Sequence, residues 1–69
     1  MISVQLNGDW HELDDDATVA DAVQLLGVPL DARGVAVAVD REVVRRGAWS
    51  DTQLSGGARV EILTAIQGG

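Results

Sequence analysis

The first thirteen residues carry the pattern that most restricts how this chain can fold. Residues 2–6 alternate between aliphatic and polar side chains, which is the period of a half-buried strand. Asn7-Gly8 follows, and this dipeptide is the strongest short-range signal for a two-residue type I′ hairpin. We therefore expect residues 9–13 to pair back antiparallel on the first strand, so that the fold is built on a sheet.

One segment has the period of an amphipathic helix. Thr18 is a favourable N-cap residue, and Asp21 occupies the acidic position of a capping box three residues later. Apolar residues then recur at the spacing of one helix face, until Gly27 and Pro29 end the pattern. We expect a short helix over residues 18–26 that packs its apolar face on the sheet.

Three later segments complete the predicted fold. Residues 35–39 are all apolar, which is typical of a central strand covered by a helix. Residues 42–44 predict a short returning strand, and residues 59–64 predict the last strand. Residues 45–57 have no clean period and contain several turn residues, so we expect an irregular crossover. One helix and four to five strands in a chain this short favour an α+β fold.

The composition excludes several kinds of chemistry. The chain has 69 residues and no cysteine, so it has no disulfide framework, no thiolate zinc site and no thiol nucleophile. Eleven acidic and five basic residues give a formal charge of −6, which argues against nucleic-acid binding. The apolar runs are too short to span a membrane, and no basic leader precedes the first strand. We expect a soluble cytoplasmic protein.

The chain ends in Gln67-Gly68-Gly69. Glycines have no Cβ, so the last residues can run extended through a slot too narrow for side chains. The α-carboxylate has an ordinary pKa of about 3.3–3.7 and is ionised at neutral pH, so its carbon is a poor electrophile until it is activated. We interpret the Gly69 carboxylate as a reactive group that a partner enzyme activates. The alternative explanation is that small residues are simply tolerated at a chain end.

Several short segments, each weak alone, lie in register with one known family. They are Asn7-Gly8, residues 17–21, residues 34–39, residues 43–44 with Arg46 and Trp49, residues 57–62 and residues 65–69. Through them the whole chain resembles the ThiS family, the small sulfur carriers of bacterial thiamin biosynthesis. That family belongs to the ubiquitin-like β-grasp group. The resemblance implies a β-grasp domain over residues 1–65, with a mixed sheet of four to five strands and one helix across it, and a flexible tail over residues 66–69.

The resemblance also implies a function as a sulfur carrier and not as an enzyme. An E1-like adenylating enzyme of the ThiF type would adenylate the Gly69 carboxylate with ATP and magnesium. A persulfide sulfur donor would then convert it to a thiocarboxylate, which supplies sulfur to a thiazole synthase of the ThiG type. Gly68, Gln67 and Ile66 would be recognised along the tail. Ile66 is a branched aliphatic residue past the predicted last strand, and on that position we expect it to be an apolar anchor. The carrier itself would have no catalytic residue, no metal site and no cofactor.

Other functions remain open on the sequence alone. The chain could be the small subunit of a molybdopterin synthase, which uses the same tail chemistry in a permanent heterodimer. It could also be a ubiquitin-like modifier conjugated to amines, or a structural or binding module with an incidental tail.

Three further sequence features give expectations of their own. The acidic run 14–16 near His11 and Glu12 could bind a metal, but we favour a solvated run that flanks the helix N-terminus. Trp49 is expected to be buried under the crossover. The family often has Asn-Gly where this chain has Asp40-Arg41, and we expect that turn not to be type I′, because arginine at positive φ is costly.

Overall fold

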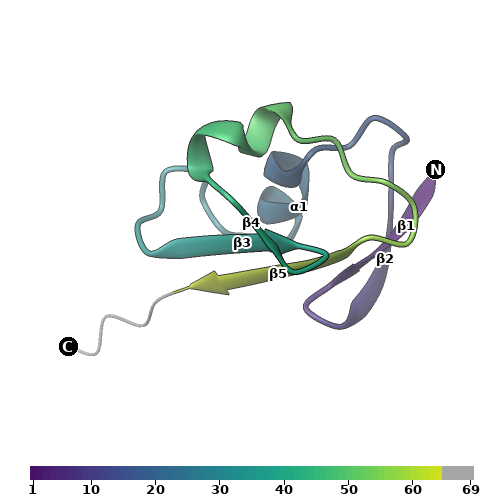
Figure 1. Cartoon of the computed structure of the whole chain (residues 1–69), viewed down its shortest axis with the longest axis horizontal. Helices are drawn as coiled ribbons and strands as arrows, with labels where there is room; N and C mark the ends of the chain where they lie inside the picture. The colour runs from purple at the N-terminus through teal and green to yellow at the C-terminus, as the bar shows by residue number, and fades with distance from the viewer. Residues whose placement is uncertain (65–69) are drawn as a thin grey trace.

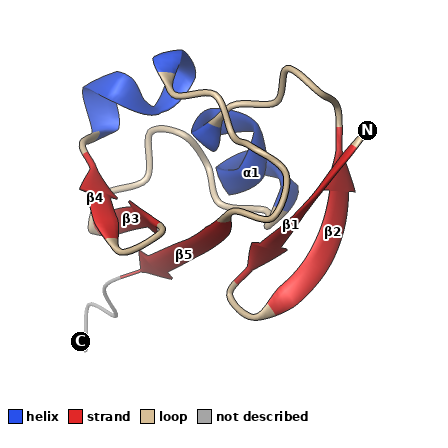
Figure 2. Ribbon diagram, turned by 45° about the vertical axis from the view of Figure 1, so that its right-hand side comes forward, coloured by secondary structure: helices blue, strands red, loops and turns tan. Residues whose placement is uncertain are grey.

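The structure is a computed structural model, and it describes residues 1–64. Along the chain the elements are β1 (Ile2–Leu6), β2 (Asp9–Leu13), α1 (Val19–Leu25), β3 (Val35–Val39), β4 (Glu42–Val44), the 3₁₀ helix η1 (Arg46–Asp51) and β5 (Arg59–Thr64). The strands form one sheet in the order β2-β1-β5-β3-β4, in which β1 and β5 are parallel and the other neighbours are antiparallel. Both helices lie on the same side of this sheet (Figures 1 and 2), so the predicted α+β fold is confirmed.

The first hairpin forms as its sequence predicts. Asn7 and Gly8 both have positive φ, at 51° and 91°, as a type I′ turn requires. Leu6 pairs with Asp9 across the turn, and the register continues along the two strands. The hairpin therefore places the aliphatic side chains of β1 on one face of the sheet.

The helix also forms where the sequence predicts it. The Thr18 side chain accepts from the backbone N–H of Asp21, and the Asp21 carboxylate accepts from the backbone N–H of Thr18, which completes the capping box. Gly27 has a φ of 79° just past the helix end, as expected for a C′ glycine. Within residues 1–64, no helix is long and apolar enough to cross a lipid bilayer.

The prediction for the second hairpin turn is wrong. Asp40 and Arg41 both have positive φ, at 49° and 72°, which is the signature of type I′. Val39 pairs with Glu42, so only two residues connect the strands, and strand twist selects this turn. Asp40 is tied to β5, because its N–H donates to the Arg59 carbonyl at 2.8 Å and its carboxylate accepts from the Arg59 N–H at 3.0 Å. These contacts offset a cost of about 1–2 kcal/mol for the left-handed conformation of Arg41.

The crossover is also more regular than its sequence suggests. Residues 46–51 form η1 rather than an irregular loop. The Trp49 side chain points inward and is only 3% exposed, and its indole N–H donates to the Val44 carbonyl at 2.9 Å. A 3₁₀ helix has three residues per turn and seldom exceeds one or two turns, so it leaves no apolar period to detect. The predicted burial of Trp49 is confirmed.

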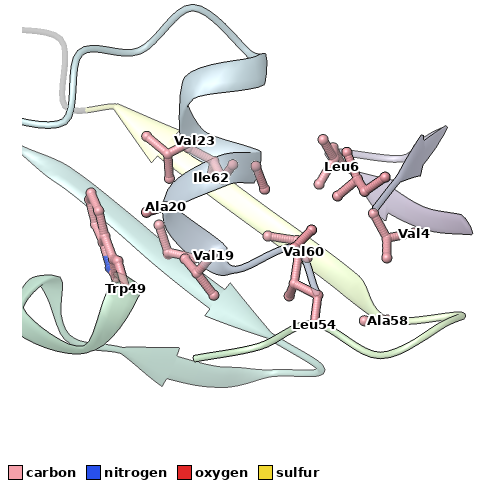
Figure 3. Packing of buried hydrophobic residues seen from close by; sticks show 14 residues of the cluster. Val4, Leu6, Val19, Ala20, Val23, Trp49, Leu54, Ala58, Val60 and Ile62 are labelled. Carbon is pink, nitrogen blue, oxygen red and sulfur yellow. The ribbon is translucent and has the colours of Figure 1, made fainter. Parts of the chain in front are cut away.

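The core lies between the helical layer and the sheet (Figure 3). Val19, Ala20 and Val23 of α1 face Val60 and Ile62 of β5, and all five are buried. The full set of buried apolar side chains is Val4, Leu6, Leu13, Ala17, Val19, Ala20, Ala22, Val23, Val37, Trp49, Leu54, Ala58, Val60 and Ile62. One face of the sheet is thereby filled by the core, and within residues 1–64 the other face carries no helix.

Candidate functional site

The predicted site residues lie beyond the part of the chain that the structure describes. They are Gly69, which is predicted to react, and Gly68, Gln67 and Ile66, which are predicted to be recognised along the tail. The proposed boundary between a domain over residues 1–65 and a tail over residues 66–69 falls there too, so these assignments stay predictions. The described chain leads toward them through β5, which ends at Thr64 opposite Val35 of β3. β5 is therefore the last described element before the predicted site residues.

The strand that leads to the tail lies inside the sheet. β5 runs between β1 and β3 in both views of the fold (Figures 1 and 2). It pairs with β3 along its length, from Val39↔Val60 to Val35↔Thr64, and with β1 only near its start, at Gln5↔Arg59 and Leu6↔Val60. β5 is therefore an internal strand that is paired on both sides near its start.

Just past the end of β1, the side chain of Asn7 continues the hydrogen bonding to β5. Its Nδ2 donates to the Ile62 carbonyl at 3.0 Å, and its Oδ1 accepts from the Ile62 N–H at 2.7 Å. Its backbone N–H also donates to the Val60 carbonyl at 2.9 Å. We call the two side-chain bonds to Ile62 the Asn7 clamp. The sequence identifies Asn7 only as a turn residue, because its contact with β5 is separated by 55 residues along the chain.

The helix-free face of the sheet carries exposed apolar side chains near the end of β5. Leu63 is 63% exposed and Val43 is 81% exposed. Leu63 pairs with Ala36 on β3, and Val43 pairs with Ala38, so all four share the face that points away from α1. We call these four residues the outer apolar patch. The alternation of β5 is the sequence signal for the outward position of Leu63, because Val60 and Ile62 point inward.

Arg46 holds the loop that enters β3. Its two terminal nitrogens donate to the carbonyls of Leu30 and Ala32, and its guanidinium lies 4.7 Å from the centre of the Trp49 ring. A guanidinium stacked on an indole while it donates from both ends is an arrangement that lysine cannot reproduce. Arg46 and Trp49 therefore act together as a structural unit beside the start of β3.

The acidic run and His11 form no metal-binding group. Within residues 1–64, no three histidine, aspartate or glutamate side chains are arranged to hold an ion. Asp15 instead pairs with the Met1 amino group at 2.7 Å. The hydrogen bond and the charge of Asp15 raise the pKa of that amino group. In the same part of the chain no polar or charged side chain is buried, so the described domain encloses no acid or base.

Comparisons with known proteins agree with this architecture. The family model described as "ThiS family" matches residues 4–69, which is nearly the whole chain and includes the diglycine end. The chain belongs to the ThiS family. Members of the ThiS family are small sulfur carrier proteins of thiamin biosynthesis, and the chain is assigned to that class on this match.

Solved structures support the assignment. The crystal structure of the thiamine biosynthesis protein ThiS from Geobacter metallireducens superimposes with a TM-score of 0.76 at 28% identity, covering 99% of this chain and 100% of that one. A solution structure of a thiamine biosynthesis protein from the same organism gives the same TM-score and identity, with 99% and 88% coverage. No curated protein matched the sequence significantly. The β-grasp fold expected from the ThiS resemblance is thereby confirmed.

Proposed function

We propose that the chain carries sulfur as a thiocarboxylate on Gly69. The observation that carries this proposal is the family match, which extends through residue 69 and so includes the terminal diglycine. The β5 strand supports it further, because an internal strand delivers the tail from a fixed position. Partners recognise the tail along Ile66, Gln67 and Gly68, and they bind the domain formed by residues 1–65.

The proposed chemistry has three steps, all supplied by partners. A carboxylate oxygen of Gly69 attacks the α-phosphorus of magnesium-bound ATP on a ThiF-type enzyme, and pyrophosphate leaves. The terminal sulfur of a persulfide donor then attacks the carbonyl carbon, and AMP leaves to give an acyl disulfide. A thiol reduces this S–S bond and is itself oxidised to a disulfide, which leaves the thiocarboxylate on Gly69. The carrier has no cysteine, so the persulfide sulfur must come from another protein or from a small-molecule thiol.

The thiocarboxylate would then be used as a nucleophile. Its sulfur attacks an electrophilic carbon of a substrate held by a ThiG-type thiazole synthase and forms a thioester. Water then attacks the carbonyl carbon of Gly69 and breaks its C–S bond, which leaves the sulfur on the substrate and the carboxylate on the carrier. We place this cycle in the cytoplasm, where ATP and the persulfide donor are available. The carrier is a co-substrate in each step, and the enclosed acid–base machinery belongs to its partners.

Intact-mass analysis tests the proposal directly. The purified chain is incubated with a ThiF-type enzyme, ATP, magnesium and a persulfide donor. We expect a mass increase equal to one oxygen replaced by sulfur, located on the C-terminal peptide. A variant lacking Gly69 is the matched control and should show no change. Stable isopeptide adducts would indicate a ubiquitin-like modifier, and permanent co-purification with a large subunit would indicate a molybdopterin synthase; either result would refute the proposal.

The outer apolar patch is the surface that best suits the activating enzyme. It lies at the tail end of β5, and its exposed leucine and valine have no cover within residues 1–64. We expect Leu63→Ala to raise the KM for the carrier by about fivefold with little change in kcat, because it removes an anchor and leaves the reacting group intact. Leu25→Ala is the matched control, since Leu25 is an exposed leucine on α1, away from the outer face. Equal KM values for both variants would exclude this docking face.

A further inference from the structure

A second feature lies at the other end of the helix-free face. A shallow hollow of about 400 Å³ is lined by Gln5, Trp10, Asp40, Arg41, Gly57 and Arg59. Strand pairing builds it, because Trp10, Gln5 and Arg59 follow one another across β2, β1 and β5. The turn between β3 and β4 adds Arg41. The Trp10 side chain is 59% exposed, so a large aromatic surface is open to solvent beside the hollow.

The hollow gathers positive charge on an acidic protein. Two of the five arginines of the chain line it, although the formal charge of the whole chain is −6. Arg59 Nε lies 3.4 Å from Gln5 Oε1, and the Asp40 carboxylate that also lines the hollow accepts from the backbone N–H of Arg59. The one ion pair formed within residues 1–64 joins Met1 and Asp15, so neither guanidinium of the hollow is paired there.

Arg41 gives an independent reason to assign a function to the hollow. Its φ of 72° is a conformation that favours glycine, and a type I′ turn is most easily closed by Asp-Gly. The turn itself therefore gives no reason for an arginine. Backbone strain of this kind is concentrated at functional positions, and the guanidinium that it places lines the hollow.

We propose that this hollow is a docking site for a carboxylate-bearing segment of a partner protein in the sulfur-carrier cycle. Guanidinium groups pair with carboxylates through two parallel hydrogen bonds, and the indole of Trp10 offers an apolar surface for the neighbouring side chain. A protein segment fits better than a free small anion, since the hollow is shallow and small-molecule sites enclose most of their ligand. Tryptophan and arginine are also the residues most enriched at protein binding hot spots.

The position of the hollow makes it a second contact point rather than part of the tail site. Arg59 begins β5 and Leu63 lies four residues later, so the two are about 13 Å apart along the strand. A partner that grips the tail and also reaches the hollow contacts the sheet at both ends of β5. This inference rests on the proposed function, because its partner is one of the two enzymes that bind the carrier.

Binding measurements with both enzymes test the inference. The variants are Arg41→Gly and Arg59→Gln, and the control is Arg33→Gln, which makes the same change in net charge in the loop before β3. Dissociation constants are measured by titration calorimetry with the ThiF-type enzyme and, separately, with the ThiG-type synthase. We expect both variants to weaken binding to at least one enzyme by about tenfold, as the loss of a charge-assisted hydrogen bond would, while Arg33→Gln has little effect. The affinity of each variant for that enzyme should also depend less on salt concentration than the wild-type affinity does.

The Arg41→Gly variant distinguishes a loss of binding from a loss of stability. Glycine suits the positive φ of this position, so thermal unfolding should occur at or above the wild-type temperature while binding weakens. Wild-type affinity of both variants for both enzymes would overturn the inference and leave the proposed function standing. Failure of the wild-type chain to gain sulfur in the mass assay would overturn the proposed function, and this inference with it.

Discussion

The Asn7→Gly variant tests whether the Asn7 clamp contributes to the free energy of unfolding independently of the turn. Glycine adopts the φ of 51° at this position readily, so the turn is kept while two partly buried hydrogen bonds to Ile62 are lost. Each such bond contributes about 0.5–1.5 kcal/mol net, so the free energy of unfolding should fall by about 1–3 kcal/mol. In a domain of this size, each 1 kcal/mol corresponds to a fall in Tm of about 4–8 °C.

Urea unfolding followed by tryptophan fluorescence provides the measurement, because buried Trp49 becomes exposed on unfolding. Asn7→Ala serves as the companion variant. Asn7→Ala loses the same two hydrogen bonds, and alanine at positive φ costs about 1–2 kcal/mol more. It should therefore be less stable than Asn7→Gly. Hydrogen exchange at the Ile62 amide should accelerate in both. If Asn7→Gly matches the wild type while Asn7→Ala is destabilised, the clamp contributes nothing and Asn7 acts through the turn alone.

Three further substitutions test other parts of the structure. Arg46→Lys should lower the free energy of unfolding by about 1 kcal/mol in urea, because lysine cannot stack on the indole and donate to both loop carbonyls; an unchanged midpoint would show that the contact is incidental. Thr18→Ala should cost about 1 kcal/mol in thermal unfolding, whereas Thr18→Ser should stay close to the wild type, and equal losses would argue against the capping box. Asp15→Asn should lower the pKa of the Met1 amino group toward its ordinary value of 8.0 in an NMR titration, and an unchanged pKa would exclude the ion pair.

The two hairpin turns show how far local sequence predicts this fold. Asn7-Gly8 was predicted correctly because both residues favour the required backbone angles by themselves. Asp40-Arg41 was not, since its geometry is imposed by strand register and by hydrogen bonds to Arg59, which lies 19 residues away along the chain. A local rule gives the preference of a turn, and long-range pairing can override it.

The same distinction applies to the candidate site. The terminal diglycine is visible directly in the sequence. The proposal that Gly69 is the reacting residue needs only the match to the ThiS family. The outer apolar patch and the hollow require strands that are distant in sequence to lie side by side, such as β1 beside β5. The sequence predicts burial of Trp49, because an aromatic side chain in a crossover is most often buried under the loop, but the 3₁₀ helix that positions it leaves no recognisable period.

The pairing of β5 bears on how the proposed sulfur carrier would present its C-terminal residues to other proteins. At its start, β5 has β1 on one side and β3 on the other, and Asn7 continues the first contact as far as Ile62. Beyond Ile62 the last pairs are with β3 alone, at Leu63 and Thr64. Restraint on the strand therefore decreases toward the tail, while the outward Leu63 side chain becomes available on the helix-free face. Under the proposed function, a partner on this face would meet a strand paired on both sides at the start of β5 and, within residues 1–64, a strand paired on one side only at its end. It could then pair with the open edge of the strand without disturbing the core.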